Sequence, residues 1–401
     1  MVVHRGRWTP EDRRRAIYRY LPVDVPRGSA SLQVRLTYER AAGVLDLGCI
    51  GAAGFRGWSG GARAAYAIGA REATPGYLPG ELEAGTWFVL LGLHRVGEQG
   101  VAYEVEARAS RWRPHGVPAS PPPPPPGERP PRRELPSSPG RRWLAGDLHT
   151  HSVHSDGVLA LGELARLGVA RGLDFLAVTD HNTTSHHAAL AAAGARAGIV
   201  LVPGQELTTA AGHANAFGGI GWVDFREPAD AWLDDTARRG GLLSINHPLA
   251  GPVAWRHTMA RPAPLVEVWH WSWGDRRWPG PLNWWRACVP AATPVGGSDW
   301  HRPGSDALPG APTTWVECDD LGAAAVLEAL GAGCVAISAG RDGPILVRHD
   351  GGLLALDAGG AWLVGPEGDR RPVRRDRAWF PGGPGSHRLA DATGATLALT
   401  P

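Results

Sequence analysis

The segment Asp147-Leu-His149-Thr-His151-Ser-Val-His-Ser-Asp156-Gly157 is the most informative part of the chain. It places a His-x-His pair at the end of an apolar run and a carboxylate shortly after it. Successive side chains of a strand point to opposite faces, so His149 and His151 share one face. Imidazole and carboxylate groups are the ligands that divalent transition metals prefer in proteins. The segment therefore predicts a metal site where a strand passes into a loop.

Similar groups recur further along the chain. They follow or lie within short apolar segments, as Thr179-Asp180-His181-Asn182, Gln205-Glu206, Gly212-His213, Asn246-His247-Pro248 and Ser298-Asp299-Trp300-His301. The apolar segments read as strands and alternate with helical patterns over 159–171 and 187–197, the second with Ser185 as a candidate cap and Gly198 as its stop. This alternation indicates an α/β barrel or layered sheet. In a barrel of this kind the active site lies at the carboxyl ends of the strands.

Composition limits the classes of function. A chain of 401 residues is long enough for two or three domains. The net charge of +2 lacks the basic signature of a duplex-binding protein, so no long nucleic-acid partner is expected. The basic N-terminus is not followed by an apolar run, which predicts no signal peptide, and no apolar stretch is long enough to span a membrane. The expected location is the cytoplasm.

The pattern of the chain predicts four regions. Residues 1–113 show period-two alternation with Gly and Pro punctuation, which favours a small N-terminal β-sandwich-like accessory domain. Residues 114–142 form a Pro-rich linker, in which Pro121–Pro126 favours a polyproline helix acting as a spacer or a surface strap. Residues 143–343 carry the metal-type motifs. Residues 344–401, rich in Gly and Asp, are expected to form a small C-terminal β extension.

The motifs of residues 143–345, taken in order, resemble the polymerase-and-histidinol-phosphatase (PHP) superfamily of metallohydrolases. The segments Thr179-Asp180-His181-Asn-Thr-Thr and Glu206-Leu-Thr-Thr before Gly-His213 are most similar to its CehA/McbA branch. The resemblance implies an α/β fold, a distorted (β/α)7 barrel, with two to three divalent metal ions (Mn, Fe or Zn).

The resemblance also implies roles for individual residues. The first metal would be held by His149, His151, Glu206 and Asp299. Glu206 would bridge to a second metal, completed by His213 and His247, with His270 as an alternative to His247. The third would be held by Asp156, His181 and His301.

The implied activity is a metal-dependent phosphoesterase acting on a phosphomonoester or small phosphodiester by attack of a metal-bridging hydroxide. Asp299 and His301 are expected at the reacting centre. Arg341 is expected to bind the phosphate or to protonate the leaving group. Asp147 is expected to be structural, and Asp180 to support a ligand imidazole or to cap a helix.

Two other functions remain open. One is hydrolysis of a carbamate or carboxylic ester, because the CehA/McbA branch includes carbaryl-type hydrolases. The Trp-rich segment from Trp255 to Trp300 suits this reading, since some of its rings would wall a pocket for a flat substrate while the others pack in the core. The other is a non-catalytic metal-binding module, against which the complete ligand set argues.

Overall fold

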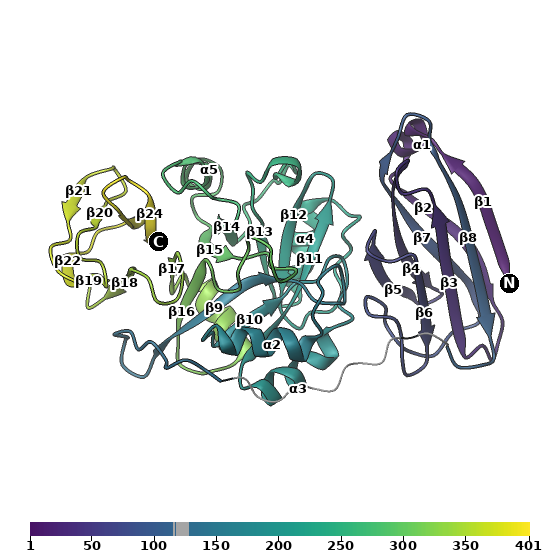
Figure 1. Ribbon diagram of the computed structural model, residues 1–401, viewed down its shortest axis with the longest axis horizontal. Helices are drawn as coiled ribbons and strands as arrows, with labels where there is room; N and C mark the ends of the chain where they lie inside the picture. Colours follow the sequence, from purple (N-terminus) through teal and green to yellow (C-terminus); the bar gives the residue numbers. More distant parts are fainter. Residues whose placement is uncertain (115–116, 118–127) are drawn as a thin grey trace. The chain divides into compact units, whose positions relative to one another are not determined.

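The computed structural model describes residues 1–114, 117 and 128–401, so the predicted polyproline helix at Pro121–Pro126 lies outside the described residues. Its contacts divide the chain into two compact units. The N-terminal unit contains Met1–Pro122 together with Val153–Ala160 and Asp180–Ala188, and the C-terminal unit contains Pro123–Ser152, Leu161–Thr179 and Ala189–Pro401. Figure 1 labels the elements of both units.

Two four-stranded antiparallel sheets make up most of the N-terminal unit. The first has the order β1-β8-β3-β6 and the second β2-β7-β4-β5. The strands are β1 (Val2–Trp8), β2 (Tyr18–Val25), β3 (Ser31–Tyr38), β4 (Gly43–Gly51), β5 (Gly54–Gly60), β6 (Ala65–Gly69), β7 (Gly85–Val96) and β8 (Val101–Ser110). The short helix α1 (Pro10–Arg15) begins with a capping box between Thr9 and Asp12.

One hydrophobic core takes side chains from both of these sheets. Val23 of β2, Leu47 of β4 and Val89 of β7 meet Val34 of β3 and Val105 of β8 in this core, all almost fully buried. Along β2 the burial alternates from residue to residue, as expected of a strand with one face in the core and the other exposed. The period-two pattern of the sequence therefore reflects the packing of two sheets.

A mixed sheet of thirteen strands organises the C-terminal unit. Its order is β15-β14-β13-β12-β11-β10-β9-β16-β17-β24-β23-β20-β21. The strands nearest the predicted metal site are β9 (Arg142–Thr150), β10 (Phe175–Val178), β11 (Val200–Thr209), β12 (Gly212–Phe217), β13 (Leu242–Ile245), β14 (Leu265–His270), β15 (Thr293–Gly297), β16 (Thr313–Cys318) and β17 (Val335–Ser338). Strands β9, β10 and β11 are parallel neighbours, and so are β13, β14 and β15.

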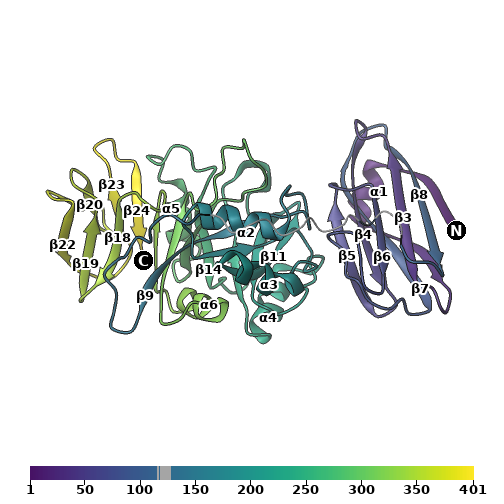
Figure 2. The same cartoon turned by 60° about the horizontal axis from the view of Figure 1, so that its bottom comes forward.

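Helices α2, α3, α4 and α6 lie in front of the strands of this unit in Figure 2, whereas α5 lies at the edge opposite α2 and α3 in Figure 1. The helices of the unit are α2 (Leu161–Ala170), α3 (His187–Ala197), α4 (Ala229–Arg238), η1 (Gly251–Val253), α5 (Gly280–Cys288) and α6 (Ala323–Gly331). Helices α2 and α3 fall where the sequence predicts them. The predicted cap of α3 is wrong: the Ser185 hydroxyl instead accepts a hydrogen bond from the Gly76 N–H (3.0 Å) and pairs with His154 Nδ1 (2.7 Å).

The strand order departs from strict strand–helix alternation. β11 and β12 form an antiparallel hairpin, and β16 pairs antiparallel with β9. The sheet nevertheless curls, since β15 lies against β9 and an isolated bridge joins Thr150 to Trp300. The fold is thus mixed α/β with strands in the majority.

Of the C-terminal strands, β20, β21, β23 and β24 continue this sheet through the pairing of β24 with β17, whereas β18, β19 and β22 form a separate three-stranded sheet. These strands are β18 (Ile345–His349), β19 (Gly352–Leu356), β20 (Trp362–Val364), β21 (Arg370–Pro372), β22 (Arg377–Pro381), β23 (His387–Ala390) and β24 (Thr396–Thr400). A separate core containing Leu353, Leu363 and Leu389 holds them together.

The described end of the Pro-rich segment is fixed to the C-terminal unit. Arg129 donates to the carbonyls of Leu173 and Gly198 (both 2.8 Å), and Arg133 donates to those of Arg341 (2.6 Å) and Gly343 (2.7 Å). This part of the segment therefore acts as a strap along the surface of that unit. Among the described residues, no helix combines the length and the apolar character needed to cross a membrane.

Candidate metal centre

Metal-type side chains gather at the carboxyl ends of the parallel strands. His149 and His151 come at the end of β9, His247 follows β13, His270 ends β14, and Asp299 follows β15. Parallel strands present their carboxyl ends at the same edge of the sheet, so these residues converge although the sequence separates them widely. The period-two alternation of β9 brings both rings of the His-x-His pair to this edge.

The first group of possible ligands consists of His149, His151, Glu206 and Asp299, whose ligand atoms all lie within 4.8 Å of one another. Asp299 Oδ1 lies 3.2 Å from His149 Nε2 and 2.9 Å from His151 Nε2. Glu206 Oε1 lies 3.2 Å from the same His149 nitrogen. Apart from Asp299, which is one-fifth exposed, these side chains are fully buried.

A second group shares Glu206 with the first and adds His213 and His247. Glu206 Oε1 lies 3.1 Å from His213 Nδ1 and 3.4 Å from His247 Nε2, and it accepts a hydrogen bond from Asn246 Nδ2 (2.9 Å). Glu206 comes from β11 and His213 from the next strand of the hairpin. One carboxylate thus takes part in two overlapping clusters, which is the arrangement a bridging ligand needs.

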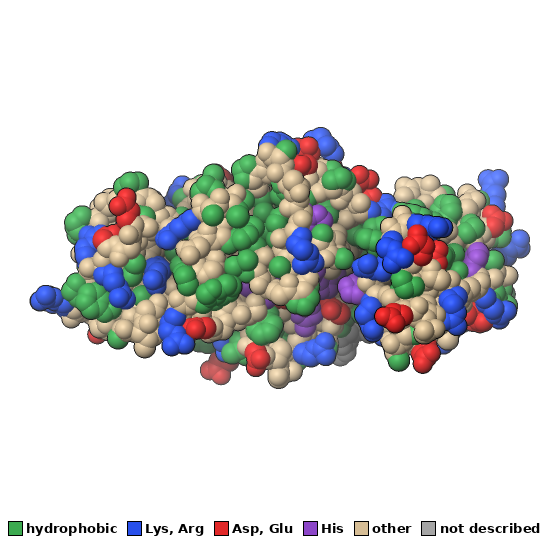
Figure 3. Space-filling view, turned by 90° about the horizontal axis from the view of Figure 1, so that it is seen from above, with side chains coloured by type: hydrophobic (Ala, Val, Ile, Leu, Met, Phe, Trp, Pro, Cys, Tyr) green, Lys and Arg blue, Asp and Glu red, His purple; other side chains and the backbone are tan. Residues whose placement is uncertain are grey.

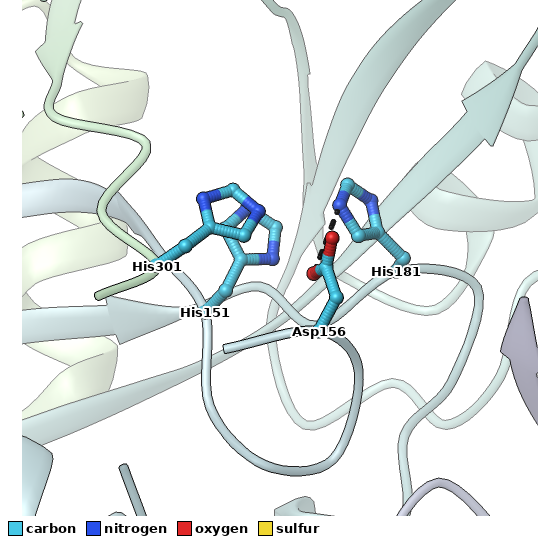
Figure 4. A group of neighbouring side chains, drawn as sticks. All are labelled: His151, Asp156, His181 and His301. Carbon is cyan, nitrogen blue, oxygen red and sulfur yellow. Dashed lines mark ion pairs between the residues drawn. The ribbon is translucent and has the colours of Figure 1, made fainter. Parts of the chain in front are cut away.

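A further group consists of His151, Asp156, His181 and His301, shown in Figure 4. Asp156 points toward His181, with 3.5 Å between its Oδ1 and the imidazole Nε2. The rings of His151 and His301 stack with centroids 4.1 Å apart. His301 Nδ1 donates to the carbonyl of Asp299 (2.8 Å), which selects the neutral tautomer whose Nε2 carries the lone pair.

These clusters have the properties of a set of metal ligands. Donor atoms about 2.0–2.1 Å from a common ion lie about 3.0–3.4 Å from one another, which matches the spacings between these side chains. His149 Nε2 is buried 3.2 Å from both Glu206 Oε1 and Asp299 Oδ1 but has no well-directed hydrogen bond among the described residues. Burial opposes a charged His149 ring, but Glu206, Asp299 and Glu267 together hold its pKa well above the usual value. A bound cation would neutralise the same carboxylates, so His149 would no longer need to carry the extra proton.

Glu267 of β14 is a buried carboxylate that the sequence did not single out. Its Oε1 accepts from His149 Nδ1 (3.1 Å), and its Oε2 accepts from the backbone N–H of His247 (2.9 Å). Burial alone would raise its pKa, yet His149, His270 and His247 lower it below the ordinary value. Glu267 therefore orients one imidazole with Nε2 toward the cluster and fixes the backbone of a second possible ligand. In the sequence, Glu267 could have been noticed as a charged residue within an otherwise apolar predicted strand.

His270 also belongs to the cluster, in a group with His247 and Asp299. Its Nε2 lies 3.4 Å from Asp299 Oδ2, and its Nδ1 pairs with Ser272 Oγ (2.7 Å). The sequence offered His270 as an alternative to His247, and the structure places both beside the cluster. Burial would raise the pKa of Asp299, but His149, His151 and His270 hold it well below the usual value.

Two residues of the cluster have left-handed backbone conformations that side chains with a Cβ rarely adopt. His247 has φ 28° and Asp299 has φ 52°. Each lies two residues beyond the end of a strand, His247 after β13 and Asp299 after β15, where the chain turns at the sheet edge. Such conformations cost about 1–3 kcal/mol and persist where the surroundings hold them.

Asp147 is fully buried and serves the backbone around the cluster. It accepts hydrogen bonds from the N–H groups of His149 (3.1 Å), Ser298 (3.0 Å) and Gly310 (2.8 Å). These bonds tie the end of β9 to the segments that follow β15 and precede β16. The structure thus gives Asp147 a role in holding these segments together, in agreement with the structural role expected of it.

Asp180 accepts a hydrogen bond from Ser155 Oγ (2.6 Å), and its Oδ2 lies 3.3 Å from His186 Nδ1. One imidazole that it contacts is thus that of His186, which is not among the predicted ligands. Arg341 donates to the Pro131 carbonyl (3.0 Å) and to the Asp342 carboxylate (2.7 Å). The contact with Pro131 lies along the Pro-rich strap.

The tryptophans of the Trp-rich segment, expected to divide between the core and the wall of a pocket, differ in exposure. Trp269, Trp285 and Trp300 are buried, whereas Trp271 and Trp278 are 40% and 50% exposed. A cavity of about 40 Å³ is lined by Trp273 and Trp278 together with His247, Glu267 and His270. Aromatic walls therefore stand directly beside the cluster.

No protein-family model matches the chain. Over 97 residues it is 41% identical to a 3',5'-nucleoside bisphosphate phosphatase of Chromobacterium violaceum, covering 24% of this chain and 34% of that protein. Over 63 residues it is 41% identical to a 5'-3' exoribonuclease of Haemophilus influenzae, covering 16% and 23%. The chain thus spans about a third and about a quarter of the length of these relatives.

Solved structures also resemble this chain. A two-domain protein of Bacteroides vulgatus containing a predicted PHP-like metal-dependent phosphoesterase is 18% identical, with a TM-score of 0.44 over 69% of this chain and 99% of that one. A putative metal-dependent phosphoesterase of Bifidobacterium adolescentis is 17% identical, with a TM-score of 0.33 over 41% and 90%. These two relatives and two structural neighbours are hydrolases or phosphoesterases by name.

Proposed function

We propose that this protein is a metal-dependent phosphoesterase that hydrolyses a phosphomonoester or a small phosphodiester. The observation that carries the proposal is the buried Glu206, whose carboxylate joins two overlapping groups of possible ligands. Structural metal sites are closed by four ligands around one ion, whereas hydrolytic sites commonly pair two ions. The proposal includes the distorted (β/α)7 PHP architecture for residues 143–343 and membership of the CehA/McbA branch.

The proposed ligands are those that the sequence indicated. His149, His151, Glu206 and Asp299 hold the first ion, Glu206, His213 and His247 the second, and Asp156, His181 and His301 a third. When bound, Mn, Fe or Zn ions supply activation of water near neutral pH and neutralisation of the phosphoryl oxygens. The protein supplies the fixed geometry: Glu267 sets the ring of His149, and the Asp299 carbonyl sets that of His301.

The substrate we favour carries a flat group next to its phosphate, as a nucleotide does. The Chromobacterium relative is named for a nucleoside bisphosphate, and the shared segment is 41% identical. The cavity beside His247 and His270 is too small, at about 40 Å³, to enclose a base, but the half-exposed Trp278 in its wall offers a stacking surface next to the cluster. On the face seen in Figure 3, Arg side chains and acidic side chains are interspersed, which suits a small substrate.

The second candidate function is hydrolysis of an aryl carbamate or a carboxylic ester, and the same aromatic wall favours it. The two reactions need the same activated water but differ in the group attacked. A metal-binding module without activity is the third reading. The part expected of Arg341, phosphate binding or leaving-group protonation, stays a prediction.

The test is elemental analysis of the purified protein beside an assay with p-nitrophenyl phosphate, bis-p-nitrophenyl phosphate and 1-naphthyl methylcarbamate. Two to three ions per chain with phosphoester turnover is the expected result. His149→Ala and Asp299→Ala should each abolish turnover while the N-terminal β-sheets stay folded. Turnover of the carbamate alone would replace the proposal by the second candidate, and full activity of both variants would refute the ligand assignment.

A further inference from the structure

A second cavity of the C-terminal unit lies between α5, the loop that precedes it and the C-terminal strands. Its volume is about 110 Å³, and four arginines line it: Arg276, Arg277, Arg286 and Arg388. Its described lining contains no aspartate or glutamate. The cavity is therefore strongly basic within a chain whose net charge is only +2.

Neutral acceptors hold three of these guanidinium groups in place. Arg286 donates to Ser386 Oγ (3.0 Å), Arg388 donates to Thr396 Oγ1 (3.2 Å), and Arg276 donates to the Thr396 carbonyl (3.3 Å). Arg277 differs, since it is paired with the carboxylate of Asp275. Because serine and threonine groups carry no charge, they orient the three guanidiniums without neutralising them. Each guanidinium has five N–H donors, so donors remain for a ligand.

The charges of this cavity also act on one another. Burial lowers the pKa of Arg286 below its ordinary value. Burial likewise lowers the pKa of Arg388, and the positive charges of Arg370 and Arg286 lower it further. Arginine stays protonated despite such shifts, so the protein bears the cost of holding like charges together. A bound anion would offset that cost.

We propose that this cavity is a second binding site, separate from the metal centre, for an oxyanion of the phosphate type. The guanidinium fork matches two phosphate oxygens at once, and Arg286 and Arg388 are the principal donors. The cavity is several times the roughly 30 Å³ share of one water molecule, so it has room for such an anion.

The anion has two possible sources: free inorganic phosphate, or a second phosphate group of the substrate of the proposed phosphoesterase. The second source rests on the proposed function, and the first does not. A binding experiment therefore comes before any assay of turnover.

Inorganic phosphate is titrated calorimetrically into the metal-loaded wild-type protein, into the Arg286→Gln/Arg388→Gln double variant and into Arg377→Gln. Arg377 is an exposed arginine of β22 outside the cavity, so its variant controls for the loss of charge. The wild type and Arg377→Gln should show a phosphate-binding event that the double variant lacks or shows with at least tenfold weaker affinity. Identical isotherms for all three proteins, with matching melting temperatures, would overturn the proposal.

A kinetic arm identifies the source of the anion. If it is part of the substrate, the double variant should raise KM for a nucleoside 3',5'-bisphosphate at least tenfold and leave KM for p-nitrophenyl phosphate unchanged. If it is free phosphate, the titration should lose its event while both KM values stay the same. Should the protein hydrolyse no phosphoester, the titration still decides the anion site.

Discussion

Replacing Glu267 by glutamine tests whether the carboxylate beneath the cluster prepares the metal ligands. The glutamine side chain would have nearly the shape of the glutamate but only one acceptor oxygen. The native carboxylate accepts from His149 Nδ1 through one oxygen and from the His247 N–H through the other. In the variant one of these donors faces an amide NH2 group. We expect weaker metal binding with little change in the fold.

The expected size follows from these two contacts. A buried donor left without an acceptor costs about 1–3 kcal/mol. Loss of the negative charge also removes the preference for the His149 tautomer whose Nε2 faces the cluster. Removal of such a supporting partner typically weakens metal affinity about 10- to 100-fold, equivalent to about 1.4–2.7 kcal/mol.

Competition with a chromophoric chelator measures the affinity directly, without reference to turnover. Glu317→Gln is the matched control, because its buried carboxylate accepts two hydrogen bonds from Ser138 and belongs to none of the described ligand groups. The control should lose stability without losing metal affinity. Wild-type affinity in Glu267→Gln, or equal losses in both variants, would refute the reasoning.

Three further predictions concern stability. Asp147→Ala should lower the free energy of unfolding by about 3 kcal/mol, since three buried N–H groups lose their acceptor at about 1 kcal/mol or more each. Urea denaturation of the metal-free protein measures this loss, and a loss under about 1 kcal/mol would contradict the prediction. Stripping the ions with EDTA should lower the melting temperature reversibly, because an ion present at about 100 times its Kd stabilises by about 2.7 kcal/mol; a melting temperature that EDTA leaves unchanged would argue against bound metal. His387 is almost fully buried, and burial, with Arg348 and Arg371, lowers its pKa below 6.5. As the pH falls below about 6.5, the imidazole of His387 is therefore protonated more readily in the unfolded state than in the folded state, and the free energy of unfolding decreases. His387→Gln should make the urea midpoint change less between about pH 7.5 and 5.5. A midpoint that depends on pH as strongly in the variant as in the wild type would count against this reasoning.

The strands, and the side chains that gather at the sheet edge, could be predicted because they follow local rules. Alternation along β9 fixes the relation of His149 to His151, and apolar segments ending in polar residues mark the sheet edge. Helix α3 follows its pattern from His187 to its glycine stop. In each case the evidence lies within one short segment of the chain.

The remaining features depend on contacts between distant segments. Glu267 gains its role only when β14 lies beside His149, which is more than a hundred residues earlier in the chain. Ser185 fails as a helix cap because Gly76 and His154 engage its hydroxyl first. The guanidinium of Arg341 donates to the carbonyl of Pro131, 210 residues earlier in the chain. Partners that lie so far apart in the sequence cannot be predicted from residue spacing.

The left-handed backbone at His247 and Asp299 places stability and function in opposition at the same two residues. Glycine would adopt φ values of 28° and 52° without the cost that a Cβ brings. A selection for heat resistance alone would therefore favour glycine at these positions, most of all at His247, since aspartate tolerates this conformation better. The same replacements would delete the proposed ligands, so a lineage that kept its metals would have to gain heat resistance elsewhere in the chain.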